Sequence, residues 1–208
     1  DDPTTPLVDE GTQGLVLDTP LQITGATVIA TEDSSNLAIS RSRTSFWIGD
    51  ADGAIKVYLN AQEPSGIPEF EIQTGQRVSF TVRRINRYLG SPEIIGIGML
   101  NDETTKEESD MSLVSTGNRV FVWTPDREIR PSDWNRVVRI TGNLTGTARE
   151  CGGAYRCWDI DYGFGRASVR SNRDTLTTGN CITFVGPLNF YQGEPELFVR
   201  NASWLRRY

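Results

Sequence analysis

Histidine is absent from all 208 residues of the chain. It is the commonest general base near neutral pH and the commonest metal ligand, so its absence excludes His-based triads and most zinc sites. Carboxylates remain as acid–base groups, and Asp159 and Asp161 are the best candidates for an enzyme. Since no pair of carboxylates stands in a recognisable catalytic pattern, we expect a protein without catalytic activity, cofactor or metal site.

Long apolar runs are missing as well. No stretch approaches the roughly 18 apolar residues that cross a bilayer, which predicts no transmembrane helix. Residues 1–14, DDPTTPLVDEGTQG, are polar and acidic and are expected to form a disordered leader. Such leaders often follow a processed N-terminus, as with a removed signal or a lipid-bearing Cys. We therefore expect a periplasmic, outer-membrane-anchored or extracellular protein.

Lysine is scarce, and the net charge of −6 is unevenly distributed. Residues 102–110 carry −4, whereas residues 111–208 carry +4 through thirteen arginines. The isoelectric point of about 4.8 lies far below the value above roughly 9 that is typical of nucleic-acid-binding domains. The charge of the whole chain therefore does not favour nonspecific nucleic-acid binding.

Two segments of the chain repeat each other. The first contains LQITGATVIAT, FWIGDADGAIKVYLN and TGQRVSFTVRRINRYLGSPEI; the second contains VRITGNLTGTA, CWDIDYGFGRASVRSN and TGNCITFVGPLNFYQGEPEL. Gly25 matches Gly142, and Trp47 matches Trp158. A period of roughly 100 residues indicates duplicated domains, because solenoid repeats are about 20–50 residues long.

Each copy is expected to be built of strands. Ile55, Val57 and Leu59 alternate with polar residues, and so do Val78, Phe80 and Val82. Five strands with Gly-rich turns predict an all-β fold of two five-stranded OB-fold-like Greek-key barrels in tandem. The expected organisation is a leader at 1–14, a first barrel at 15–101, an acidic linker at 102–115 and a second barrel with an N-terminal extension at 116–208. In that extension, Val120, Val122 and Trp123 resemble an extra strand, and residues 130–134 a helical turn.

The GDADGA stretch, residues 49–54, has two interpretations. An Asp-Gly pair between two alternating strands is typical of a hairpin turn. A calcium loop would need a third acidic position and a distal Glu, which are missing. The sequence therefore favours the hairpin.

These motifs resemble OB-fold domains of bacterial secreted and lipid-anchored proteins. FWIGDADGAIKVYLN followed by TGQRVSFTVRRINRYLGSPEI carries the resemblance, and the second copy departs from it at DIDYGFG. Such domains also accompany extracellular nucleases. The resemblance implies a fold and leaves the function open, since OB-folds host many unrelated tasks.

Three cysteines allow at most one intramolecular disulfide. Cys151 and Cys157 flank GGAYR near the expected loop between strands one and two of the second barrel, and we predict that they are bridged. The alternative is three reduced thiols in a cytosolic protein. Cys181 is expected to point outward from its strand. It is either a free thiol or the true disulfide partner of Cys151 or Cys157.

A ligand of an OB-fold usually lies on strands two and three, between the loops that join strands one to two and four to five. Aromatic rings and cations occur together there in both copies, although the matched Trp47 and Trp158 are expected to be packing residues. The densest basic run is RRINRYLG at 83–90. The candidate ligand-binding residues are Tyr155, Arg156, Tyr162, Phe164, Arg166, Arg170, Arg43, Lys56, Tyr58, Arg84 and Arg87.

The function expected from these patterns is a noncatalytic exported module that contacts protein partners in the cell envelope or outside the cell. The alternative is binding of single-stranded nucleic acid, or of a glycan, through the aromatic and Arg face of the second barrel. The two differ in one measurable respect, because nucleic-acid binding weakens steeply with salt.

Overall fold

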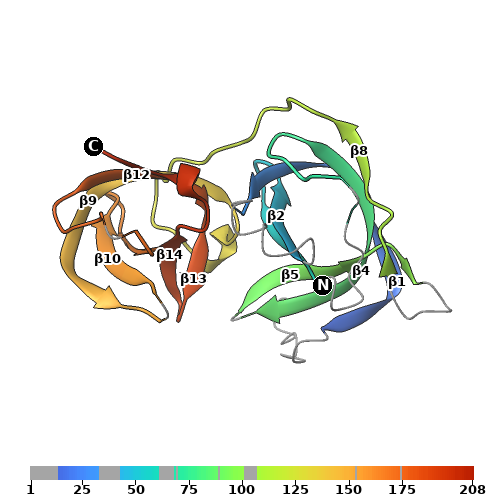
Figure 1. Cartoon of the computed structure of the whole chain (residues 1–208), viewed down its shortest axis with the longest axis horizontal. Helices are drawn as coiled ribbons and strands as arrows, with labels where there is room; N and C mark the ends of the chain where they lie inside the picture. The colour runs from blue at the N-terminus through green and yellow to red at the C-terminus, as the bar shows by residue number, and fades with distance from the viewer. Residues whose placement is uncertain are drawn as a thin grey trace. The chain divides into compact units, whose positions relative to one another are not determined.

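A computed structural model describes residues 14–32, 43–60, 68, 70–88, 90–100, 107–152, 154–173 and 175–208. The expected leader therefore lies, apart from Gly14, outside the described residues. The chain divides into two compact units, Asp1–Gly49 with Ile55–Val120, and Asp50–Ala54 with Phe121–Tyr208. Figure 1 shows the strands of both units, which we describe one at a time.

The first unit is a closed five-stranded barrel. The sheet order is β1-β2-β3-β5-β4, and β4 pairs back with β1. Strands β3 and β5 run parallel, whereas β1 is antiparallel to both β2 and β4. The strands are β1 (Leu15–Thr31), β2 (Arg43–Gly49), β3 (Ala54–Asn60), β4 (Arg77–Tyr88) and β5 (Ser91–Ile97).

The alternation of apolar residues predicts the core of this barrel correctly. Val57, Leu59 and Val78 are fully buried, as are Phe80 and Val82, while Ile55 packs against the same core from a partly buried position. Burial of an aliphatic or aromatic side chain contributes roughly 1.5–3 kcal/mol. These residues therefore account for why β3 and β4 close around one interior.

The second unit repeats this strand order. Its sheet runs β13-β14-β11-β10-β9-β12-β15, with β11 and β14 parallel. Only Leu188 separates β12 from β13, so together they form the fourth strand of an OB-fold order. This confirms the predicted all-β fold class. The strands are β9 (Val137–Glu150), β10 (Arg156–Asp161), β11 (Arg166–Ser171), β12 (Cys181–Pro187), β13 (Asn189–Tyr191), β14 (Glu194–Phe198) and β15 (Leu205–Arg207).

The segment between the two sets of barrel strands has structure of its own. Strand β6 (Met99–Leu100) pairs with β7 (Glu107–Glu108), and β8 (Ser112–Ser115) pairs with β4. Strands β7 and β8 thus fall within the range expected to be an acidic linker. Further on, Trp123 forms a single bridge with Val138, and Val120 and Val122 belong to no strand, so the extra strand is not formed. The predicted helical turn is the 3-10 turn η2 (Pro131–Asp133).

The stretch GDADGA is a turn, as predicted. It joins β2 to β3, and the Asp50 carboxylate accepts hydrogen bonds from the backbone N–H groups of Asp52 and Gly53. The N–H of Asp50 donates to the carbonyl of Gly53. An Asp that caps its own turn in this way explains the acidic residue without any ligand.

Gly25 and Gly142 occupy matched strands but have different backbones. Gly25 has φ of +61° and lies where the register of β1 and β4 shifts between Ile23 and Ala26. Gly142 pairs regularly with Ile182. The predicted equivalence of the two glycines thus holds for their position in the barrel and fails for their conformation.

Alanine at these two glycines is expected to have unequal costs. A Cβ at Gly142 would lie 2.6 Å from the carbonyl oxygen of Asp161, and backbone must move to relieve this contact. We expect Gly142→Ala to lower the free energy of unfolding by roughly 2–3 kcal/mol. Gly25→Ala would meet only the flexible end of Arg77 at 2.9 Å, and its positive φ costs about 1 kcal/mol. Urea unfolding measures both, with Gly53→Ala, which meets nothing within 4 Å, as the control.

Candidate ligand-binding face of the second barrel

Four side chains form a stacked cluster on the second barrel. The guanidinium of Arg170 lies 5.0 Å from the ring centroid of Tyr155 and 4.6 Å from that of Phe198. The guanidinium of Arg200 lies 4.4 Å from the Phe198 ring, and the two rings meet edge to face at 5.0 Å. We call Tyr155, Arg170, Phe198 and Arg200 the aromatic–arginine cluster.

Strand pairing brings the cluster together. Arg170 on β11 is the register partner of Phe198 on the parallel strand β14. Their chain neighbours Val169 and Leu197 are fully buried. Because side chains alternate along a strand, Arg170 and Phe198 point to the outer face of the barrel. The cluster therefore lies on the outer face of strands three and five.

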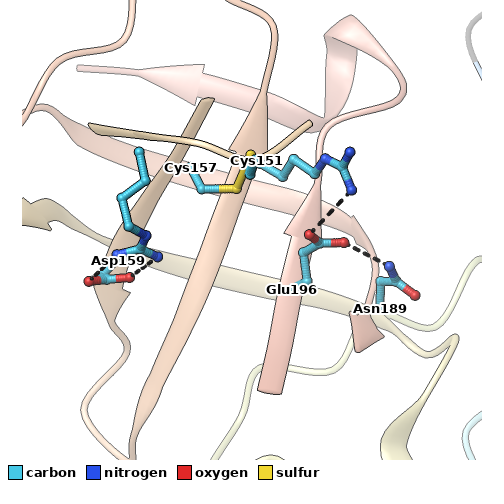
Figure 2. The surroundings of a disulfide bond; sticks show 7 residues. Cys151, Cys157, Asp159, Asn189 and Glu196 are labelled. Carbon is cyan, nitrogen blue, oxygen red and sulfur yellow. Dashed lines mark hydrogen bonds and ion pairs between the residues drawn. A yellow bond between two sulfur atoms is a disulfide. The ribbon is translucent and has the colours of Figure 1, made fainter. Parts of the chain in front are cut away.

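A disulfide holds the loop that supplies Tyr155. Cys151 ends this loop on the β9 side and Cys157 lies in β10, and the two are bridged as predicted. Within the loop, the N–H of Cys151 donates to the carbonyl of Tyr155, and the N–H of Tyr155 donates to the carbonyl of Gly152. The bridge lies beside the side chains discussed below (Figure 2). Cys181 is a free, partly buried thiol on β12.

A buried carboxylate, that of Glu196, forms an ion pair with Arg170. Glu196 is only 3% exposed, and its Oε2 accepts a hydrogen bond of 2.8 Å from Asn189 Nδ2. Its Oε1 lies 3.8 Å from Nη1 of Arg170 (Figure 2). The chain of contacts continues to Trp134, whose Nε1 donates to Asn189 Oδ1 at 3.2 Å. A buried carboxylate is stable only when it is paired and hydrogen-bonded, so Asn189 holds Glu196 in place and Glu196 attracts Arg170 across 3.8 Å.

The two candidate catalytic carboxylates are engaged in local contacts. Asp159 and Arg149 form a two-pronged ion pair at 2.8 and 2.9 Å. The hydrogen bond from Arg149 outweighs desolvation and, with the charges of Arg149 and Arg166, lowers the pKa of Asp159. Asp161 accepts a hydrogen bond from the N–H of Gly163 and closes the turn after β10. Within the described ranges, no three His, Cys, Asp or Glu side chains gather as they would around a metal ion.

The remaining candidates of the second barrel do not all join the cluster. Arg166 is exposed on the outer face of β11, and Arg156 is exposed at the start of β10. Tyr162 and Phe164 follow the far end of β10, roughly 20 Å from Tyr155 at about 3.3 Å per residue. The hydroxyl of Tyr162 accepts a hydrogen bond from the N–H of Ile129, so Tyr162 anchors the extension.

In the first barrel the structure joins Lys56 and Tyr58. Lys56 Nζ lies 5.0 Å from the Tyr58 ring and 3.1 Å from Glu93 Oε2. Arg84 and Arg87 are partly buried on β4, and Arg43 begins β2, with its side chain outside the described residues. The prediction that the matched tryptophans pack inside is confirmed, since Trp47 is 5% exposed and Trp158 is 1% exposed.

Sequence reasoning missed Phe198, Arg200 and Glu196 in the second barrel and Glu93 in the first. One signal for the two glutamates was present, because Pro92-Glu93 and Pro195-Glu196 match between the copies. No signal identified Phe198, which is brought to the cluster by the parallel pairing of strands far apart in the chain.

No family model and no curated protein matches the chain. Among solved structures, the tetrameric p202 HIN2 domain is similar with 13% identity and a TM-score of 0.39, over 91% of this chain and 92% of that one. A murine DNA-binding protein bound to double-stranded DNA has 13% identity and a TM-score of 0.39, over 90% and 94%. A replication protein A heterotrimer bound to single-stranded DNA has 14% identity and a TM-score of 0.37, over 95% and 51%. Similarities this low carry no argument about the ligand of this chain.

Proposed function

We propose that this protein binds single-stranded nucleic acid through the outer face of its second barrel. The observation that carries this proposal is the aromatic–arginine cluster, in which the guanidinium of Arg170 covers both Tyr155 and Phe198, whose rings also touch, while Arg200 covers Phe198. Cations interleaved with aromatic rings serve both parts of a nucleotide: guanidinium groups contact phosphates, and rings stack on bases.

The chemistry of the aromatic–arginine cluster favours a polyanion over a neutral glycan. The cations of the cluster are Arg170 and Arg200, whereas Arg166 is exposed at the far end of β11, opposite Asp161. The Nε of Arg170 is buried and has no hydrogen-bond partner within the described ranges, so ring stacking and the distant Glu196 hold this side chain. Guanidinium is the group that recognises phosphate oxygens through paired donors. An uncharged sugar would use the rings and leave these cations without a role.

The disulfide supports the expectation that the protein is exported. Disulfides persist in oxidising compartments and are rare in the cytosol. Exported nucleic-acid binding is consistent with the resemblance to domains that accompany extracellular nucleases. In the part of the chain that the structure describes, no helix is suited to cross a membrane. None of the contacts described above among the residues of the structure supports the alternative function, a protein-binding module.

A fluorescence anisotropy titration with a labelled twelve-residue oligothymidine tests the proposal. Two phosphate contacts, by Arg170 and Arg200, predict an affinity that falls roughly 7-fold between 50 and 200 mM salt, from a slope of about −0.7 per contact. Tyr155→Ala is expected to weaken binding about 10-fold by removing one stacking partner. Arg200→Gln is expected to make the salt slope shallower by about 0.7.

Tyr208→Ala is the matched control, because Tyr208 is 73% exposed at the C-terminus and has no part in the cluster. It should bind as the unmodified protein does, and a neutral dextran should not compete. The proposal is wrong if the oligonucleotide does not bind. It is equally wrong if Tyr155→Ala and Arg200→Gln, checked for folding by near-UV circular dichroism, leave affinity and salt slope unchanged.

A further inference from the structure

The hairpin that joins the last two barrel strands is the same in both units. Residues 86–93 and 189–196 share the pattern Asn-x-Tyr-x-Gly-x-Pro-Glu. In each hairpin the Asn is the register partner of the Glu, as Asn86 is of Glu93 and Asn189 of Glu196. The turn glycines, with φ of +91° and +87°, have the same left-handed conformation. The duplication has therefore kept this hairpin in geometry as well as in sequence.

Each hairpin glutamate meets a cation from the third barrel strand. Glu93 is 5% exposed and pairs with Lys56 at 3.1 Å, while Glu196 is 3% exposed and lies 3.8 Å from Arg170. Both cations also cover aromatic rings, Lys56 that of Tyr58 and Arg170 those of the aromatic–arginine cluster. Lys56 is the register partner of Glu93, whereas Ser168 is the register partner of Glu196. Arg170 therefore lies two residues beyond the position that corresponds to Lys56, on the same face of the strand.

The tyrosine of each hairpin is exposed on this same face. Tyr88 is 55% exposed and Tyr191 is 47% exposed. Each follows the Asn by two residues, and side chains two apart on a strand share a face. Tyr88 and Tyr191 therefore lie on the outer face of their hairpins, two residues along the strand from the Asn that pairs with the buried Glu. An exposed large aromatic side chain contributes little to folding and presents a ring on which a ligand can stack.

We infer that the chain has two equivalent binding sites for single-stranded nucleic acid, one on each barrel, with Tyr88 and Tyr191 as the matching base-stacking residues. The inference rests on the proposed function and adds to it a site on the first barrel, built from Lys56, Tyr58 and Tyr88. It also adds Tyr191 as a contact residue of the second. Each barrel should therefore bind its own copy of a short oligonucleotide, since one OB-fold covers about 4–16 nucleotides.

Isothermal titration calorimetry of the whole chain with a six-residue oligothymidine tests this inference through stoichiometry. The unmodified protein should bind two oligonucleotides per chain. Tyr88→Ala and Tyr191→Ala should each leave one site unchanged and weaken the other about 10-fold, so that one tight site per chain remains. Tyr208→Ala, which removes an exposed tyrosine outside both hairpins, should keep two.

The outcomes separate this inference from the proposed function. A single site that is weakened by Tyr155→Ala and insensitive to Tyr88→Ala would overturn the first-barrel site and leave the proposed function standing. Two sites that neither hairpin variant weakens would overturn the assigned role of the tyrosines. Absence of any binding would overturn both proposals. Because Tyr88 and Tyr191 are exposed, the variants should fold, and their melting temperatures check this directly.

Discussion

Replacing Asp133 by asparagine is expected to lower the free energy of unfolding of the second unit by about 3 kcal/mol. Asp133 is 1% exposed and accepts two hydrogen bonds of 2.7 Å from Arg127, with Arg136 at 3.3 Å and the N–H of Arg130 at 2.9 Å. Both arginines also cover the ring of Trp123, at 4.9 and 4.8 Å. An amide in place of the carboxylate removes the charge and turns an N–H group toward guanidinium donors.

Tryptophan fluorescence during urea unfolding measures this effect. Four of the five tryptophans, at 123, 134, 158 and 204, belong to the second unit, so the signal reports mainly on it. Asp126→Asn is the matched control, since Asp126 is exposed and should change the unfolding free energy by under about 0.5 kcal/mol. A loss below about 1 kcal/mol for Asp133→Asn would show that the extension is not held by this carboxylate.

The same carboxylate gives the stability a pH dependence. Burial alone would raise the pKa of Asp133, but the hydrogen bonds from Arg127 and Arg130 and the charges of Arg127 and Arg136 more than offset it and lower this pKa. A lowered carboxyl pKa stabilises the fold above the unfolded value of about 3.9, and this contribution is lost as the pH falls through the folded value. The difference between the unmodified protein and Asp133→Asn should therefore shrink below about pH 4.

Removing the disulfide is expected to loosen the aromatic–arginine cluster as well as the fold. Cys151 and Cys157 are six residues apart, and a loop this short predicts a loss of about 2 kcal/mol when both become serine. The loop that carries Tyr155 would then be free to leave Arg170 and Phe198. We expect the affinity for oligothymidine to fall about 10-fold, with part of the binding energy spent on ordering the loop again.

Cys181→Ser is the control for this double variant, because Cys181 is the free thiol and lies on β12. It should leave oligothymidine binding unchanged. Treatment of the unmodified protein with a dithiol reductant should reproduce the loss of affinity seen with Cys151→Ser and Cys157→Ser combined. Unchanged affinity in the reduced protein and in the double variant would show that Tyr155 keeps its place without the bridge.

Much of the fold was predictable because its signals are local. Alternation at residues 55–59 and 78–82 marks strands with one buried face, and the Asp-Gly pair at residues 52–53 marks the turn between β2 and β3. The Cys151–Cys157 bridge was predictable for the same reason, since both ends flank one short loop. The extra strand at residues 120–123 failed because a strand needs a paired neighbour, which apolar composition does not supply.

The candidate binding face was only partly predictable. Residue type and position predict Tyr155 and Arg170 correctly, but the same criteria also predict Tyr162, which lies at the opposite end of β10. The sequence does not predict Phe198 and Arg200 as site residues, because their proximity to Arg170 depends on the parallel register of β11 and β14. The repeat shows that Tyr88 and Tyr191 match, but only the structure shows that both side chains face solvent.

The amino-acid sequence by itself determined where most strands and turns lie and that the barrel occurs twice, because each depends on neighbours within a few residues or on a direct repeat, and it favoured the Cys151–Cys157 bridge that the structure contains. Only the tertiary structure decided which side chains meet. Glu196 reaches Arg170, and Trp134 reaches Asn189, after a sheet closes and sets its register over long chain separations. That register follows from packing of the whole barrel interior, which no short segment contains.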